Sequence, residues 1–104
     1  MSFEVNEPKI NEGLQELMKK KINYVKNNLE RHLSELKELK KEHPSKFNHE
    51  LKFVGAVVSV QNNEYNKIKN FVEGNILTES YDKIFHELVK DYRENIKRLI
   101  KWNQ

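Results

Sequence analysis

Residues 18–39 read MKKKINYVKNNLERHLSELKEL, and this stretch repeats one pattern of side chains along its whole length. Its mainly apolar positions alternate at intervals of four and three residues, and they are Met18, Ile22, Val25, Leu29, His32, Leu36 and Leu39. Residues with this spacing lie on one face of an α-helix, and mostly charged or polar residues fill the positions between them. The stretch therefore predicts a long amphipathic helix with one face in a hydrophobic core.

Two prolines mark the ends of this first helix. The segment Asn6–Pro8 combines a capping side chain, an acidic residue and a proline in the first turn, where its missing N–H costs no hydrogen bond. Pro44 disfavours the helical conformation for His43, the residue before it. We therefore expect the first helix over residues 7–42.

The same spacing continues after Ser45, which can cap a second helix. Its positions are Phe47, Leu51, Val54, Val58, Tyr65, Ile68 and Val72. The β-branched segment 53–60 is also compatible with a buried strand, but the chain holds no second strand candidate to pair with it. A helix over 45–73 is therefore favoured, with a kink or a split at Gln61–Asn63, where the spacing is interrupted.

The third helix is marked at both ends. Gly74 and Asn75 favour the left-handed conformation that ends a helix, and Thr78 can cap the next one. Apolar residues then recur at Tyr81, Phe85, Leu88, Tyr92, Ile96 and Leu99, which predicts a helix over 78–102. Three helices with short connections pack up-down-up, so we expect an all-α protein, a three-helix antiparallel bundle that forms one domain over 1–104.

The residue types that most catalytic and metal sites need are missing or badly spaced. The chain has no cysteine, which excludes thiolate metal sites and a cysteine nucleophile. Its four histidines show no HxxxH or HExxH spacing, and its three glycines are too far apart for a phosphate-binding loop. His32 is expected in the core, with a pH-sensitive packing role as the alternative. We expect neither enzyme activity nor a bound metal or cofactor.

The segment 53–60 is apolar around nearly its whole circumference, more than one bundle can bury. The residues that would remain exposed on the surface of the bundle are an apolar row with two small residues beside it, namely Phe53, Val57, Val60, Gly55 and Ser59. The small residues would let another helix approach closely, so these five form the expected partner-binding site. The partner would be a protein of unknown identity or a second copy in a homodimer. This predicts an interaction protein of the inhibitor, immunity, adaptor or chaperone type.

Charge is distributed unevenly along the chain. Residues 1–16 carry four acids and one lysine, whereas residues 17–46 carry nine bases and four acids. The basic residues expected to form a positive face on the first helix are Lys19, Lys20, Lys37, Lys40 and Lys41. Such a face can bind nucleic acid, but lysines near a helix C-terminus also complement the helix dipole. Nucleic-acid binding is therefore the alternative function.

The first residues have neither a basic stretch nor an apolar run typical of a secretion signal. The longest apolar run, 53–60, is far shorter than the roughly 20 residues that cross a bilayer. We therefore expect a cytoplasmic protein that does not bind membranes.

Overall fold

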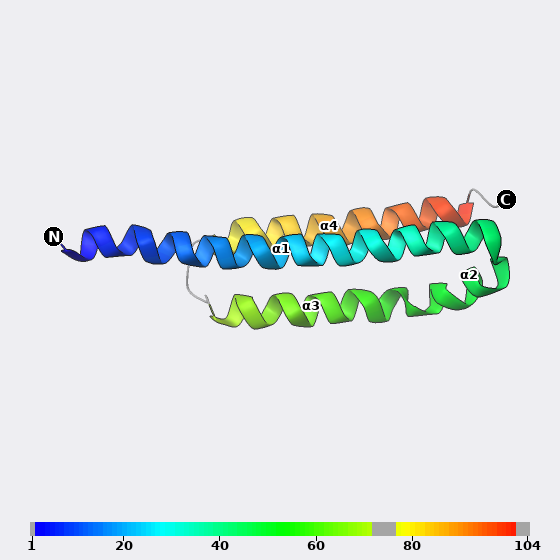
Figure 1. Ribbon diagram of the computed structural model, residues 1–104, viewed down its shortest axis with the longest axis horizontal. Coiled ribbons are helices and arrows are strands. Elements are labelled where there is room, and N and C mark those ends of the chain that lie inside the picture. Colours follow the sequence, from blue (N-terminus) through cyan, green and yellow to red (C-terminus); the bar gives the residue numbers. More distant parts are fainter. Residues whose placement is uncertain (1, 72–76, 102–104) are drawn as a thin grey trace.

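The computed structural model describes the backbone of residues 2–71 and 77–101, and the side chains of residues 15–70 and 79–101. The elements are α1 (Ser2–Glu42), α2 (Pro44–Glu50), a 3₁₀ turn η1 (Leu51–Phe53), α3 (Val54–Phe71) and α4 (Leu77–Lys101). They form a rod of 64 × 19 × 18 Å (Figure 1). The helical class is confirmed, and the described residues contain no strand.

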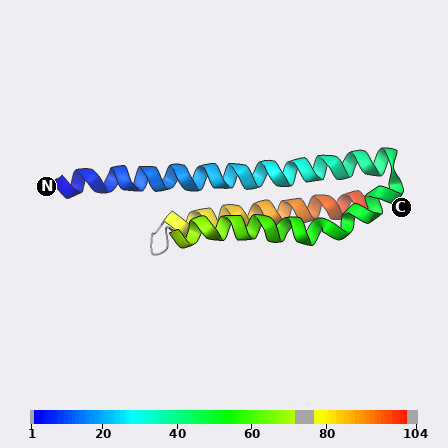
Figure 2. The same ribbon diagram turned by 60° about the horizontal axis from the view of Figure 1, so that its bottom comes forward.

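The long helix α1 packs against both α3 and α4 (Figures 1 and 2). It runs parallel to α4 and antiparallel to α3, which confirms the up-down-up bundle. The core lies between the three helices, and its buried apolar residues are Met18, Ile22, Val25, Leu29, Leu36, Phe47, Tyr65, Phe85, Tyr92 and Ile96. The four-three spacing therefore predicted the buried face of each helix correctly.

The second helical segment is divided, but not where the sequence predicted. The division is the tight turn η1 at Leu51–Phe53, whereas α3 continues unbroken through Gln61–Asn63. Gln61 is buried, and its side-chain oxygen accepts a hydrogen bond from the amide of Asn28 on α1 at 3.1 Å. The polar residue that interrupts the apolar spacing is thus accommodated by a polar partner, and the helix needs no kink there.

The helix ends agree with the sequence in part. α1 ends at Glu42 before Pro44, as predicted, but it begins at Ser2 instead of residue 7. Pro8 therefore lies inside the helix, where it cannot donate a backbone hydrogen bond to the preceding turn. α4 begins at Leu77, one residue before the expected start. The stop signal at 74–75 and the final residue 102 of the predicted helix lie outside the described residues.

Residues 2–16 of α1 continue beyond the ends of the other helices. His32 pairs with Tyr92 and Lys40 with Leu99, separations of 60 and 59 residues, so the start of α4 is level with residues 17–18 of α1. Figures 1 and 2 show the N-terminal part of α1 running past α3 and α4. A Cβ added at Gly13 would meet nothing within 4 Å. We call residues 2–16 the N-terminal extension, which is about 22 Å long at about 1.5 Å per residue.

Candidate protein-binding groove

One end of the α3–α4 pair is held together by a cluster of side chains. The rings of Tyr65 and Phe85 stack with their centroids 4.5 Å apart and 6° between their planes. The Tyr65 hydroxyl donates a hydrogen bond to Asp82 Oδ1 at 2.6 Å, and Lys69 Nζ lies 2.9 Å from Asp82 Oδ2. This cluster fixes the spacing of α3 and α4 near the C-terminus of α3.

The carboxylate in this cluster is stabilised in its charged form. Burial alone would raise the pKa of Asp82, but hydrogen bonds from Tyr65 and Lys69, with the positive charges of Lys69 and His86, outweigh burial and lower it. Burial and the hydrogen bond to Asp82 raise the pKa of the Tyr65 hydroxyl well above its ordinary range. The cluster is therefore intact at neutral pH, with Asp82 ionised and Tyr65 protonated.

Asp82→Asn is expected to destabilise the fold at neutral pH and to matter less in acid. A depressed folded-state pKa contributes stability that is present above the unfolded pKa and is lost as the pH falls through the folded pKa. The advantage of the parent over Asp82→Asn should therefore be full at pH 7 and should begin to fall below about pH 4, the ordinary pKa of an aspartate. Urea unfolding of both proteins at pH 7 and pH 3 measures this. A constant difference across that range would contradict the assigned role of the charge.

Beyond this cluster, α3 and α4 leave an open groove between them. Its volume is about 540 Å³, and the residues that line it are Val58, Asn62, Phe85, His86, Val89, Lys90, Arg93, Glu94 and Lys97. Val58, Phe85 and Val89 are the apolar residues that line the groove, and they form its floor. Phe85 belongs to the buried core, and the two valines are partly buried against that core. The groove thus combines apolar side chains with a charged wall.

That wall is a row of basic side chains on α4. His86, Lys90, Arg93 and Lys97 follow one another at intervals of four, three and four residues, which places them on one helix face. All four are exposed, and Glu94 is the acid among the lining residues. The row was missed in the sequence because α4 is nearly balanced in charge overall. The same four-three spacing that identified the core would have identified it.

The structure separates the five predicted partner-binding residues. Gly55 and Ser59 are exposed and share a face of α3 with Asn62, which lines the groove, although neither residue lines it. Val60, 55% exposed, lies about half a turn from Asn62 on α3 and therefore on the face away from the groove, and Phe53, 44% exposed, lies in the turn η1 before α3 begins. Val57, the fifth residue, is partly buried against the core. The five residues do not form one continuous patch.

The outer edge of α1 and α3 holds a second, smaller group of exposed apolar side chains. Lys21 Nζ on α1 lies 3.5 Å from the Glu64 carboxylate on α3. Tyr24, 53% exposed, has Lys21 Nζ 5.0 Å from its ring centroid, and Val60 on α3 is 55% exposed. These exposed residues are scattered singly along the edge, which is common on protein surfaces.

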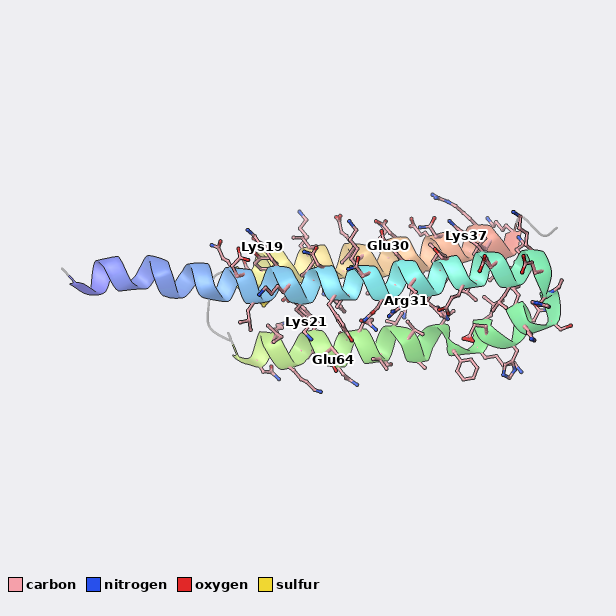
Figure 3. All side chains as sticks on the ribbon, in the orientation of Figure 1. Lys19, Lys21, Glu30, Arg31, Lys37 and Glu64 are labelled. Carbon is pink, nitrogen blue, oxygen red and sulfur yellow. The ribbon has the colours of Figure 1, made fainter. Side chains whose placement is uncertain are left out.

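Three of the five lysines predicted to form a basic face of α1 share one helix face, namely Lys19, Lys37 and Lys41, whereas Lys20 and Lys40 lie about a quarter turn to either side of it. Lys19 and Lys37 lie on the edge away from α3, with the acidic Glu30 between them (Figure 3). Lys40 donates a hydrogen bond to the carbonyl of Leu99 near the C-terminus of α4. Lys20 is exposed about a quarter turn from Lys19, and Lys41 is exposed near the end of α1. These residues do not form an uninterrupted row like that on α4.

The buried histidine joins three helices in a closed network. His32 Nδ1 lies 2.6 Å from the Tyr92 hydroxyl on α4, and Nε2 lies 3.3 Å from Glu50 on α2. A carboxylate only accepts, so Nε2 carries the proton toward Glu50 and Nδ1 accepts from Tyr92. Burial and the negative charge of Glu50 raise the pKa of Tyr92 to about 12. His32 and Tyr92 are both buried, so this network is a structural feature of the core.

Neither a metal cluster nor a membrane-spanning helix is found in the described part of the chain. No three histidine, aspartate or glutamate side chains gather there as metal ligands would. No described helix combines the length and the apolar character needed to cross a membrane. Comparisons with protein-family models, curated proteins and solved structures give no match. The function must therefore be inferred from the groove itself.

Proposed function

We propose that this protein is a non-catalytic binding module that holds an acidic amphipathic helix of a protein partner in the α3–α4 groove. The observation that carries the proposal is the position of the basic row directly beside the apolar floor. An amphipathic helix presents apolar and charged side chains on adjacent faces, so it complements both parts of the groove.

The dimensions of the groove support a helix as the occupant. Its α4 wall runs from Phe85 to Lys97, about 18 Å at about 1.5 Å per residue, the length of three helical turns. On the α3 side, Gly55 and Ser59 leave room for a close approach, and a Cβ added at Gly55 would meet nothing within 4 Å. A helix seated here would turn the three-helix bundle into a local four-helix bundle.

The two parts of the groove contribute differently to binding. Burying apolar surface against Val58 and Val89 supplies the affinity, at about 25 cal/mol per Å² before the costs of association. The exposed Lys90, Arg93 and Lys97 select acidic partners and speed their association, and salt weakens this effect. A charged phosphate backbone gains no binding energy from an apolar floor, whereas the apolar face of an amphipathic helix does. The groove therefore favours a protein helix over nucleic acid. Nucleic-acid binding by α1 stays a prediction.

Binding of a model helix tests the proposal. A synthetic helical peptide of about 18 residues, with leucines on one face and glutamates on the others, should bind the parent protein, as measured by fluorescence anisotropy. A peptide with lysine in place of every glutamate should not bind. Arg93→Glu combined with Lys97→Glu should weaken binding of the acidic peptide about tenfold or more, equivalent to about 1.4 kcal/mol.

The matched control is Lys20→Glu combined with Lys41→Glu, which makes the same change in net charge on α1. This variant should bind the acidic peptide as the parent does. Equal loss in both double variants would show that net charge, and not the groove, attracts the peptide, and would contradict the proposal. A single-stranded oligonucleotide that binds the parent and is lost only from the α1 variant would support the alternative function.

A further inference from the structure

We infer that a hollow between the C-terminal parts of α1 and α4 is a binding site for linked phosphate groups, whether these belong to a small polyphosphate or to a nucleic-acid strand. The volume of the hollow is about 490 Å³, and the residues that line it are Lys37, Asn95, Arg98, Leu99 and Lys101. The inference concerns a different side of α4 from the α3–α4 groove, so it goes beyond the proposed function and does not depend on it.

Both helices bring cations to this hollow. Lys37 lies on the edge of α1 away from α3 (Figure 3), and the register of α1 and α4 places it level with residues 96–97. Arg98 and Lys101 are three residues apart and share a face of α4. All three cations are exposed, and Asn95 adds a side-chain amide that can donate a hydrogen bond. The lining therefore carries three positive charges and no acid.

The excess of positive charge is confined to this end of the α1–α4 pair. The adjoining hollow, which shares Asn95, has Lys26, Glu30 and Asp91 as its charged lining residues, so its charges nearly cancel. Glu94, the acid nearest in the chain to the two cations of α4, lines two other hollows and not this one. Even when Glu94 is counted, the three cations leave an excess of positive charge.

The helix dipoles do not account for this cluster. Basic residues in the last turn of a helix complement its dipole, and Arg98 and Lys101 lie in the last turn of α4. Lys40 already serves this purpose, because it donates a hydrogen bond to the carbonyl of Leu99. Lys37 lies before the last turn of α1, so no helix end explains its place in the same hollow.

Within the described residues the three cations have no counter-ion, since no ion pair there includes any of them. The neighbours of Lys37 at three and four positions are Leu33, Ser34, Lys40 and Lys41, so none attracts it and two repel it. The acidic N-terminal extension ends about 30 Å away along α1, well beyond the range of unscreened attraction. A bound anion would relieve this repulsion, and local conflicts of this kind are typical of functional sites.

The chemistry of the lining favours phosphate over other anions. The guanidinium of Arg98 can bind two phosphate oxygens at once, and the two ammonium groups add point charges beside it. Three cations match the charge of two or three linked phosphates, whereas one carboxylate of an acidic peptide would neutralise a single cation. Leu99 is the apolar member of the lining, so an amphipathic helix would bury little apolar surface here.

Titration calorimetry of the full-length protein with inorganic tripolyphosphate tests the inference. The parent should bind one tripolyphosphate per chain, and added salt should weaken this binding. Lys37→Gln combined with Arg98→Gln should weaken it about tenfold or more. Without ligand, this double variant should unfold at the same urea concentration as the parent or a higher one, because the substitutions remove repulsion and no packing.

The matched control is Lys20→Gln combined with Lys83→Gln, which makes the same change in net charge at the other end of the bundle. Both side chains are exposed, and neither lines the hollow. The control should bind tripolyphosphate as the parent does. Equal weakening in the two double variants would show attraction by net charge alone and would overturn the inference, as would a parent that shows no saturable binding.

A single-stranded oligonucleotide of about ten nucleotides distinguishes the two sources of phosphate. If it binds the parent, is displaced by tripolyphosphate and is lost from the Lys37→Gln, Arg98→Gln variant, the site accepts a nucleic-acid strand. If tripolyphosphate binds and the oligonucleotide does not, the site accepts a small polyphosphate. Oligonucleotide binding that is unchanged in this variant, with no tripolyphosphate binding, would overturn the inference. The acidic helical peptide should bind this variant as it binds the parent, so the proposed function is tested separately.

Discussion

Leu36→Ala is expected to lower the free energy of unfolding by about 2–5 kcal/mol. The Leu36 side chain is 0% exposed and belongs to the core shared by the three helices. Its removal takes away buried apolar area and leaves a cavity that the rigid helices can close only in part. Urea unfolding should show a lower midpoint with an unchanged slope.

The control for this prediction is Lys41→Ala on the exposed side of the same helix. Its effect should stay under about 0.5 kcal/mol, because the side chain lies in solvent and is not needed for packing. A loss at Lys41 as large as that at Leu36 would mean that α1 buries a different face. The same comparison can be made on α4 with Phe85→Ala and Glu87→Ala.

The second large effect is expected from the buried network around His32. His32→Leu leaves the Tyr92 hydroxyl buried without its acceptor, at a cost of about 1–3 kcal/mol. Tyr92→Phe leaves Nδ1 of the imidazole without its donor, at a similar cost. Each single change therefore breaks a contact of 2.6 Å and leaves one polar group behind.

The double variant should be less destabilised than the two single effects predict together. His32→Leu with Tyr92→Phe removes both members of the hydrogen bond, so no unsatisfied group remains between α1 and α4. A double-mutant cycle from urea unfolding should give a coupling of about 0.5–3 kcal/mol. Additive effects would show that the hydrogen bond between His32 and Tyr92 contributes nothing to stability, and would contradict the prediction.

A structural feature of this protein can be predicted from the sequence when the residues that cause it lie within a few positions of one another in the chain. Burial in a helix follows a local rule, because residues three and four apart share a face, and so Val25 and Leu36 could be assigned to the core from spacing alone. The break at Pro44 is equally local. The division at Leu51–Phe53 was not predicted. The sequence instead predicted a break at the polar Gln61, because this residue interrupts the apolar spacing. Its hydrogen-bond partner Asn28 lies on another helix, so the local spacing cannot predict that the helix continues there.

The sequence by itself determined the helical class, the end of α1 before Pro44, the buried face of each helix and the up-down-up order, because these depend on apolar spacing and proline within a few residues. The predicted caps Asn6, Ser45 and Thr78, by contrast, all lie inside helices. Only the tertiary structure decided which exposed residues lie together. Gly55 and Val60 are close in the chain but lie on different sides of α3, whereas Asn62 and Lys97 line one groove from different helices. A groove exists only where two helices meet, so its basic wall and apolar floor depend on the register between α3 and α4, which Tyr65 and Asp82 fix through contacts between residues far apart in sequence.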